Sequence, residues 1–217
     1  MGFQRARTEN QIVGRQDEII AACDAIYLKK GYEAVNFKSI SRKTSISRPS
    51  IYNYYKTKEE IFLDILKQVL IKWKKEFKSH FDATSKMTNE EFCTFLANTV
   101  TKQEKHLELL TVYMHPIEKN SRLEKLEEFK AETNCFFLIF RGGLDKFFPH
   151  AEEEKKNTFM FYCMTIVYGA YPVTHLSEKQ VNAMKKADPN YKTPDYYEVC
   201  YYAFLVLMAD IDSASKI

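Results

Sequence analysis

Glycine and proline are rare in this chain, and their rarity constrains its fold more than any other feature does. Only 6 Gly and 6 Pro occur among the 217 residues, although a sandwich or a barrel needs many tight turns that use them. Apolar residues recur instead at spacings of three and four, which is the period of one helix face. We therefore predict an all-α fold.

Capping residues indicate where these helices begin and end. The first helix, expected to begin near Glu9, stops at Gly31, because glycine readily adopts the positive φ found after a helix. Asn36 and Ser47 can each cap a short helix, and Pro49 suits the first turn of the second one. Further helices should start at capping boxes, in which Ser or Thr precedes Glu or Gln by three residues: Thr57–Glu60, Thr88–Glu91, Ser121–Glu124 and Ser177–Gln180. In total we expect nine or ten helices.

Positive charge is concentrated near the amino terminus. The whole chain has a formal charge of only +3, but residues 1–60 hold 11 Lys and Arg against 7 Asp and Glu. Within them, the segment 36–58, NFKSISRKTSISRPSIYNYYKTK, contains six basic residues and no acidic one. Such a run is usually no more than a solvated surface, so its placement must decide whether it binds nucleic acid.

The basic segment coincides with two short predicted helices joined by a short turn. In a helix-turn-helix, the second helix enters the major groove of DNA with its first residues on the base edges. Arginine is suited to guanine there, and an amide side chain is suited to adenine. The second helix offers Arg48, Ser50 and Asn53 for base contacts, and its buried side is expected to consist of Ile51 and Tyr55.

In this region the chain resembles the tetracycline-repressor-like (TetR/AcrR) transcriptional regulators. The resemblance extends over about residues 15–66, and as a combined pattern it is far more specific than any single motif. It implies that the segment 47–54 reads the major groove and that Tyr52 and Lys58 meet the phosphate backbone. The residues that carry it are Ile19, Ala22, Gly31, Tyr32, Ile40, Ile46, Ser47, Ile51, Tyr52, Tyr55, Lys58, Glu59 and Ile61.

Backbone N–H groups at helix starts, with lysines beside them, complete the expected DNA surface. Two positions depart from the pattern of the family. The family usually has Gly in the turn at Ser45, so we expect left-handed backbone strain of about 1 kcal/mol there. Asn36 replaces the usual Thr or Ser and preserves the helix cap. The full set expected to bind DNA is Lys38, Ser47, Arg48, Pro49, Ser50, Tyr52, Asn53, Tyr54 and Lys58.

The resemblance also implies two domains. Residues 1–58 are expected to form the helix-turn-helix DNA-binding domain. Residues 59–217 are expected to form a helical domain that binds a small-molecule effector and makes a homodimer through the last two long helices. A two-fold dimer places its reading helices about 34 Å apart, so it predicts a palindromic operator in double-stranded DNA.

Two apolar segments support the dimer independently. Residues 157–177 contain no Lys, Arg, Asp or Glu, and residues 199–209 are equally apolar. The first segment approaches the length of a bilayer span, but its Tyr, Thr, Gly and Pro content argues against a membrane helix. We expect it to be buried on nearly all sides within protein. Two such helices are hard to bury in a monomer, so they indicate a surface for a partner.

Aromatic and methionine residues suggest an effector pocket in the carboxy-terminal part. At helical spacing, such residues are core more often than ligand contacts. If they line a pocket, their aromatic bias indicates an apolar or aromatic effector. The effector's identity, the operator sequence and the choice between repressor and activator stay open. The candidate residues are Tyr113, Met114, Phe136, Phe137, Phe140, Tyr162, Met164 and Tyr168.

Two other classes of function compete with a DNA-binding regulator. An enzyme is disfavoured, because the histidines lack ligand spacing and no glycine-rich phosphate loop or Gly-x-Ser-x-Gly motif occurs; we expect no catalytic residue, metal or cofactor. The second alternative is a helical ligand-binding or adaptor protein whose basic unit binds an acidic protein partner. Charge alone does not exclude it, but the placement of Arg48, Ser50 and Asn53 favours DNA.

Cysteine usage and the amino terminus indicate the compartment. The five cysteines, Cys23, Cys93, Cys135, Cys163 and Cys200, are scattered and form no Cys-x-x-Cys pair. We interpret them as small core residues in a reducing environment. The first ten residues lack the apolar run of a secretory signal. We therefore expect a cytoplasmic protein.

Overall fold

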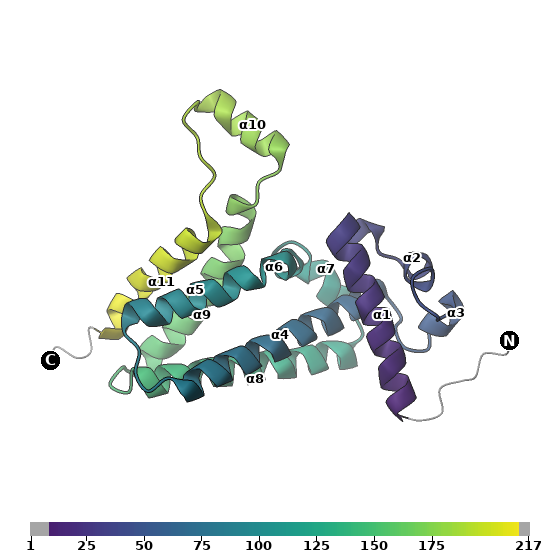
Figure 1. The fold of residues 1–217 in the computed structure, drawn as a ribbon, viewed down its shortest axis with the longest axis horizontal. Coiled ribbons are helices and arrows are strands. Elements are labelled where there is room, and N and C mark those ends of the chain that lie inside the picture. Colours follow the sequence, from purple (N-terminus) through teal and green to yellow (C-terminus); the bar gives the residue numbers. More distant parts are fainter. Residues whose placement is uncertain (1–8, 213–217) are drawn as a thin grey trace. The chain divides into compact units, whose positions relative to one another are not determined.

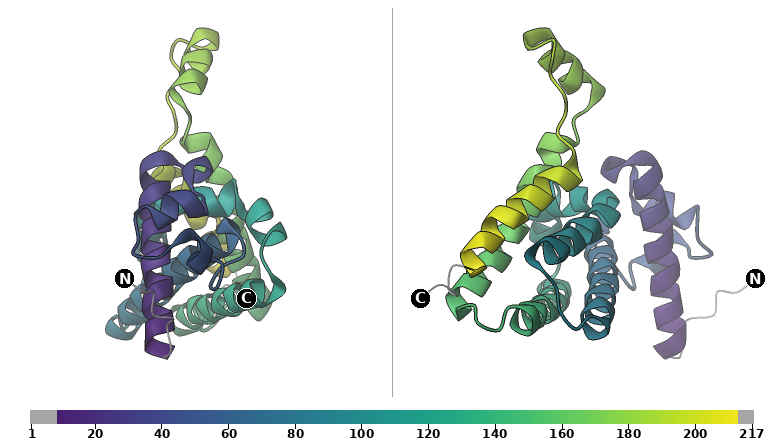
Figure 2. Two further views of the ribbon diagram at one scale, coloured as in Figure 1. Left: turned by 90° about the vertical axis from the view of Figure 1, so that its right-hand side faces the viewer. Right: turned by 60° about the vertical axis from the view of Figure 1, so that its left-hand side comes forward.

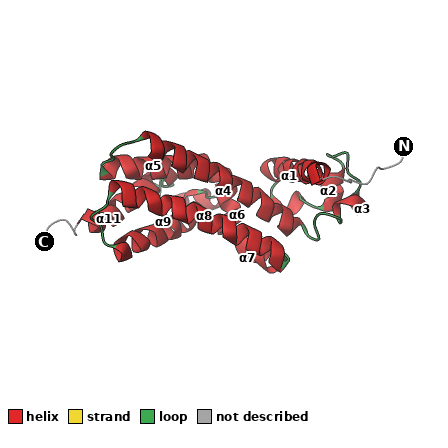
Figure 3. Ribbon diagram, turned by 90° about the horizontal axis from the view of Figure 1, so that it is seen from below, coloured by secondary structure: helices red, strands yellow, loops and turns green. Residues whose placement is uncertain are grey.

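A computed structural model of the chain describes residues 9–212; residues 1–8 and 213–217, which include most of the amino-terminal segment considered for a secretory signal, lie outside this range. Figure 3 shows helices and loops and no strand among the described residues, so the all-α prediction is confirmed. The described residues form eleven α-helices, where nine or ten are expected, and one 3-10 segment. They are α1 (Glu9–Lys30), η1 (Tyr32–Ala34), α2 (Phe37–Ser41), α3 (Arg48–Ile51), α4 (Lys58–Ala83), α5 (Asn89–Lys102), α6 (Glu104–Thr111), α7 (Met114–Lys119), α8 (Leu123–Phe147), α9 (Glu153–Thr174), α10 (Glu178–Ala187) and α11 (Tyr196–Asp212).

Local capping explains most of the helix ends in the amino-terminal part. Gly31 follows α1 with φ of 78°, and its N–H donates to the carbonyl of Tyr27 (2.8 Å). Asn36 caps α2, because its side chain accepts from the N–H of Ser39 while Ser39 Oγ accepts from the N–H of Asn36. Ser47 caps α3 by accepting from the N–H of Ser50. The predicted caps at Asn36 and Ser47 are therefore confirmed.

The four predicted capping boxes divide into two that form and two that do not. Thr88 and Ser177 each exchange both hydrogen bonds with the residue three positions on, so α5 and α10 start as predicted. The prediction at Ser121 is wrong, because its hydroxyl donates to the carbonyl of Ile117 and α8 begins at Leu123. At Thr57 only half of the box forms. The Thr57 hydroxyl accepts from the N–H of Glu60, but the Glu60 carboxylate accepts from Lys56 and Arg122.

The described residues divide into two compact units. Unit 1 comprises residues 9–68 and 114–131, and unit 2 comprises residues 69–113 and 132–212. Helices α4 and α8 contribute residues to both units. In unit 1, α1 packs on η1 and α2, and α2 packs on α3 (Figure 1). The Tyr32 ring stacks on Phe62 of α4 (4.7 Å between centroids), and Tyr27 of α1 meets the same ring edge-on (5.7 Å).

Unit 2 is built around a cluster of aromatic rings. Trp73 of α4 stacks on Phe136 of α8 with ring centroids 5.3 Å apart, and its indole N–H donates to the carbonyl of Thr99 (3.0 Å). Phe77 meets Phe136 (5.2 Å) and Phe140 (5.7 Å) edge-on. Outside this cluster, α11 packs on α9 and α5, and α6 packs on α9.

Helices α9 and α11 are covered by the chain on one side only. The inner side of α9 buries Phe159, Cys163 and Val167. Its outer side leaves Phe161 68% exposed, and on α11 Val206 is 75% exposed. Residues 157–177 are thus not buried on all sides within the single chain, since no other helix in the described part of unit 2 covers this face; burial on nearly all sides would need a partner, as the sequence predicts. No helix in the described range has both the length and the apolarity needed to cross a membrane.

Helix α10 stands apart from the other helices of unit 2. Figures 1 and 2 show it, in light green, extending away from the ends of α9 and α11 that it connects. None of its ten residues is buried.

Four of the five cysteines are buried in the core, as the sequence predicts. Cys23, Cys93, Cys163 and Cys200 are buried, and burial raises the pKa of each thiol. Cys135 on α8 is exposed, so for this residue the interpretation is wrong.

Candidate functional site

The short helix α3 presents polar residues outward above a buried apolar side. Ile51 at its end and Tyr55 four residues later have no exposed surface. Arg48 and Asn53 are exposed, as the alternation with Ile51 and Tyr55 predicts. Since α3 is only four residues long, these two buried side chains determine which face of the helix can meet a ligand.

The remaining predicted DNA contacts differ in how accessible they are. Lys38 on α2, Pro49 and Tyr52 are exposed, whereas Ser47, Ser50, Tyr54 and Lys58 are partly buried. The hydroxyls of Ser47 and Ser50 lie 2.8 Å apart and hydrogen-bond to each other. The Tyr52 ring meets Phe37 edge-on, with centroids 4.8 Å apart, so packing limits the positions that this side chain can take.

Lys58 already has partners within unit 1. Its ammonium lies 4.0 Å from the centre of the Tyr32 ring and donates to the Tyr32 carbonyl (3.2 Å). The Glu33 carboxylate is 3.9 Å away, but Glu33 is largely exposed and this weak pair is screened by solvent. Lys58 is therefore held at the start of α4 with only part of its charge turned to solvent.

The turn between α2 and α3 is held by α1. The predicted left-handed strain at Ser45 is wrong, because no described residue other than glycine has a positive φ. Glu18 accepts from the N–H of Ser45 and from its hydroxyl (3.1 Å), and Arg15 donates to that hydroxyl (2.5 Å). The sequence reasoning missed Arg15 and Glu18, whose only signal is a basic and an acidic residue three positions apart on one helix.

Two buried carboxylates on α4 form hydrogen bonds and ion pairs with basic residues of unit 1. Glu60 has no exposed surface and accepts from Arg122 Nε (2.6 Å), Arg122 Nη2 (3.0 Å) and the N–H of Lys56 (2.8 Å). Burial alone would raise the pKa of Glu60, but these hydrogen bonds outweigh it and lower the pKa below its ordinary value. Glu60 is consequently ionised at neutral pH despite its burial.

Asp64 lies one turn further along α4 and is 5% exposed. It accepts from the Tyr55 hydroxyl (2.7 Å) and pairs with Lys67 (2.9 Å) and Lys125 (3.2 Å). Burial acts to raise the pKa of Asp64, but the bonds from Lys67 and Tyr55 and the charge of Lys125 lower it. The pKa of the Tyr55 hydroxyl shifts in the opposite direction: burial and the Asp64 charge raise it.

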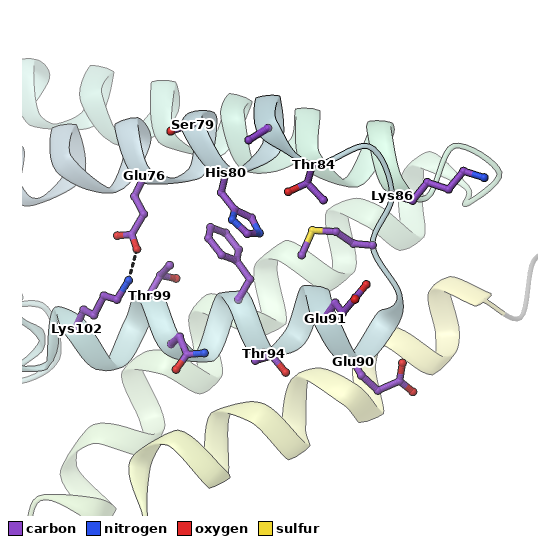
Figure 4. A pocket seen from close by; sticks show the side chains of 14 residues that line it. Glu76, Ser79, His80, Thr84, Lys86, Glu90, Glu91, Thr94, Thr99 and Lys102 are labelled. Carbon is purple, nitrogen blue, oxygen red and sulfur yellow. Dashed lines mark hydrogen bonds and ion pairs between the residues drawn. The ribbon is translucent and has the colours of Figure 1, made fainter.

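Unit 2 carries an open groove between the carboxy-terminal half of α4 and α5. Its volume is about 880 Å³. Figure 4 shows the His80 side chain over a neighbouring ring, and that ring is Phe95, stacked 4.1 Å away. Glu76 and Lys102 form an ion pair of 2.5 Å across the groove (Figure 4). The lining residues are Glu76, Ser79, His80, Ala83, Thr84, Lys86, Met87, Glu90, Glu91, Thr94, Phe95, Asn98, Thr99 and Lys102.

None of the residues predicted to bind an effector lines this groove. Phe136 and Phe140 are buried in the aromatic cluster, and the half-buried Phe137 has its ring centroid 5.7 Å from that of Phe136. Tyr162 and Tyr168 are exposed on α9, and Met164 is half-buried. Tyr113 belongs to unit 2, whereas Met114 begins α7 in unit 1. The structure thus gathers the three phenylalanines in one aromatic cluster.

The described residues contain no group of three or more His, Cys, Asp or Glu that could hold a metal ion.

Comparison with known families matches nearly the whole described chain. Residues 19–65 match the family described as bacterial regulatory proteins of the tetR family. Residues 67–198 match the tetracyclin repressor-like C-terminal domain. The second match alone covers more than half of the chain, and the boundary between the two matches falls within α4.

Individual relatives agree with these matches. The HTH-type transcriptional regulator QacR of Staphylococcus aureus is 26% identical over 134 residues, which are 59% of this chain and 70% of QacR. A putative TetR-family regulator from Mesorhizobium loti shares the fold, with a TM-score of 0.61 and 12% identity over 95% of this chain and 98% of its own. FadR from Bacillus halodurans, a fatty acid degradation regulator, gives a TM-score of 0.57 and 15% identity over 89% and 94% of the two chains.

Proposed function

This chain belongs to the tetR family of bacterial transcriptional regulators, and we propose that it acts as a homodimeric repressor released from a palindromic operator by a small apolar or aromatic effector. Family membership confirms the expectations of a DNA-binding regulator and of a protein that is not an enzyme. It also removes the alternative of an adaptor that never binds DNA. The observation that carries the proposal is the exposed polar face of α3 above the buried Ile51 and Tyr55.

The proposed contacts divide into base readout and phosphate binding. Arg48 and Asn53 are exposed on or just after α3. In the major groove, an arginine can donate to the two acceptors of guanine, and an asparagine amide can pair with the acceptor and the donor of adenine. Ser50 adds a hydroxyl on the same helix, while Lys38 and Tyr52 lie exposed where they can meet phosphates. The rest of the proposed surface comprises Ser47, Pro49, Tyr54 and Lys58.

The outer face of α9 and α11 supports the homodimer. Phe161, Tyr162 and Val173 on α9, with Tyr202 and Val206 on α11, are large apolar or aromatic residues exposed in the single chain. Contiguous exposed apolar surface of this kind is typical of a protein interface. A two-fold interface doubles the reading helix, which is why we propose a palindromic operator.

The groove between α4 and α5 supports a place for the effector. Its Phe95 ring lies 5.0 Å from Phe77, and Phe77 in turn meets Phe136 and Phe140. A molecule that displaced Phe95 would therefore reach the phenylalanines predicted from the sequence. FadR from Bacillus subtilis, which shares this fold with a TM-score of 0.53 and 14% identity over 90% of this chain, has been crystallised in complex with stearoyl-CoA. For this chain we propose only the apolar or aromatic class of ligand, acting in the cytoplasm.

Titration of fluorescent duplexes from the protein's own promoter region, at several salt concentrations, tests the proposal. Replacement of a base-reading residue, Arg48→Ala, should relax the base preference at one position of each half-site. Replacement of a phosphate contact, Lys58→Ala, should weaken all duplexes alike and lower the salt slope by about one. Equal weakening of every sequence by Arg48→Ala would remove Arg48 from base readout. Binding that ignores salt would refute the proposed interface.

A further inference from the structure

A segment distant in sequence belongs to the same compact unit as the reading helix. Residues 114–131, which contain α7 and the first part of α8, cluster with α1–α3 and the start of α4. The Thr57 hydroxyl, just before α4, donates to the carbonyl of Asn120 (3.0 Å). The N–H of Arg122 donates to Glu60 (3.2 Å). The DNA-reading part of this chain therefore includes a piece of the carboxy-terminal sequence.

Glu60 joins that segment to the end of the helix-turn-helix. Its two oxygens accept three hydrogen bonds from Arg122 and one from the N–H of Lys56. Lys56 directly follows Tyr55, whose side chain anchors α3 and whose N–H donates to the carbonyl of Ile51 (3.0 Å). A buried carboxylate that lost Arg122 would be left without its charge partner, which is unfavourable in a site closed to water. Glu60 therefore links the main chain at residue 56 to residue 122 through hydrogen bonds, although the Arg122 side chain is 43% exposed.

Asp64 makes a second, parallel connection. It accepts from the Tyr55 hydroxyl on one side and pairs with Lys125 of α8 on the other. Lys125 is held in place in turn by Glu128 (3.3 Å), which also pairs with Lys67 (2.8 Å). Through Glu60 and Asp64, both the main chain and the side chain at residues 55–56 are tied to α8.

From this arrangement we infer that Arg122 and Lys125 are positioning residues for operator binding. They touch no DNA in this role; they hold α3 at one angle to α4 through Glu60 and Asp64. Any displacement of residues 114–131 would move the reading helix with it, so α8 and α4 both carry the effector's signal to the DNA. The inference rests on the operator binding proposed above and names the residues that set its geometry.

The test compares Arg122→Gln with Lys130→Gln as a matched control. Lys130 lies eight residues after Arg122, on α8, and pairs with the partly exposed Glu118 (2.5 Å), without contact to Glu60 or Asp64. Both variants are titrated with the operator duplex and with an unrelated duplex of equal length. For Arg122→Gln we expect about tenfold weaker operator binding, less than about twofold change for the unrelated duplex and an unchanged salt slope. The control should match the wild type.

A merely structural role predicts a different pattern. If Arg122 only keeps the protein folded, both duplexes lose affinity in proportion to the folded fraction. If Arg122 contacts phosphate, the salt slope falls by about one. Either result overturns the inference, as does unchanged operator binding by Arg122→Gln. Should that variant unfold, Arg122→Lys keeps the charge but loses the two-pronged contact, and it must still weaken the operator more than the unrelated duplex.

Hydrogen exchange without DNA separates failure of this inference from failure of the proposed function. In Arg122→Gln, the amides of residues 52–56 should exchange about tenfold faster than in the wild type, while those of α5 stay unchanged. If wild-type protein binds no duplex, the proposed function fails, and the exchange rates alone decide whether Arg122 holds the reading helix. Unchanged exchange at residues 52–56 would show that it does not.

Discussion

Replacement of Phe161 by glutamate should break the proposed homodimer. Phe161 lies on the outer side of α9 and is 68% exposed in the single chain. An aromatic side chain buries about 200 Å², so roughly 140 Å² would leave water in the interface, worth about 3.5 kcal/mol per protomer at 25 cal/mol/Å². Two-fold symmetry applies the loss twice, and the new carboxylates add the cost of burying unpaired charge.

This magnitude corresponds to a large change in dimer affinity. Loss of this contact in one protomer alone raises the dimer dissociation constant by about 300-fold, since each 1.4 kcal/mol is a factor of ten. Sedimentation velocity over a range of protein concentrations measures the change directly. Operator binding should weaken in parallel, because a monomer engages one half-site only. The matched control is Leu138→Glu, because Leu138 is 64% exposed on α8 and lies outside the α9 and α11 face.

Three outcomes would refute this reasoning. A wild-type protein that sediments as a monomer at micromolar concentration has no dimer of the proposed strength. A Phe161→Glu variant that dimerises like the wild type places the interface elsewhere. Equal dissociation by Leu138→Glu shows a general effect of surface charge and not a particular interface.

Further predictions concern stability within unit 1. Gly31→Ala should lower the free energy of unfolding by about 1 kcal/mol, because residue 31 has φ of 78°; urea denaturation measures it, with Gly14→Ala in α1 as control. Tyr55→Phe should cost about 1 to 2 kcal/mol by removing the hydrogen bond to Asp64, and an unchanged denaturation midpoint would contradict this. Acid should destabilise the protein: the pKa values of Glu60 and Asp64 are lowered by folding, so their contribution is complete above about pH 4.5 and is lost as pH falls through the lowered values. Asp64→Asn should flatten that acid limb, and a wild-type stability that is constant from pH 5 to 2 would contradict it.

The elements that sequence predicts well depend on neighbours within a few residues. Gly31 ends α1, and Asn36 and Ser47 cap the next two helices, because each of these ends is made by hydrogen bonds over three or four positions. The exposed face of α3 follows in the same way from the spacing of Ile51 and Tyr55. The box at Ser121 does not form: α8 begins at Leu123, and the Ser121 hydroxyl donates to the carbonyl of Ile117 in the preceding turn.

The candidate effector residues show where periodicity stops being informative. Phe136 and Phe140 have the helical spacing of a buried stripe, and a stripe can face either a packed core or a cavity. In the structure they pack against Trp73 and Phe77, while the groove is lined by a different and more polar set. Spacing along one helix contains no information on which residues of another helix it meets.

The all-helical fold, the helix-turn-helix and the exposed face of α3 could be predicted from the sequence, because all three depend on local hydrogen bonds and on a 3.6-residue period. The pairing of Glu60 with Arg122 and of Asp64 with Lys125, 62 and 61 positions away, and the side of α9 that stays uncovered depend on tertiary contacts and do not follow from the sequence. From the sequence, a charged residue or an apolar helix face indicates only that a partner is needed. The packing of helices from distant segments determines which residue is that partner.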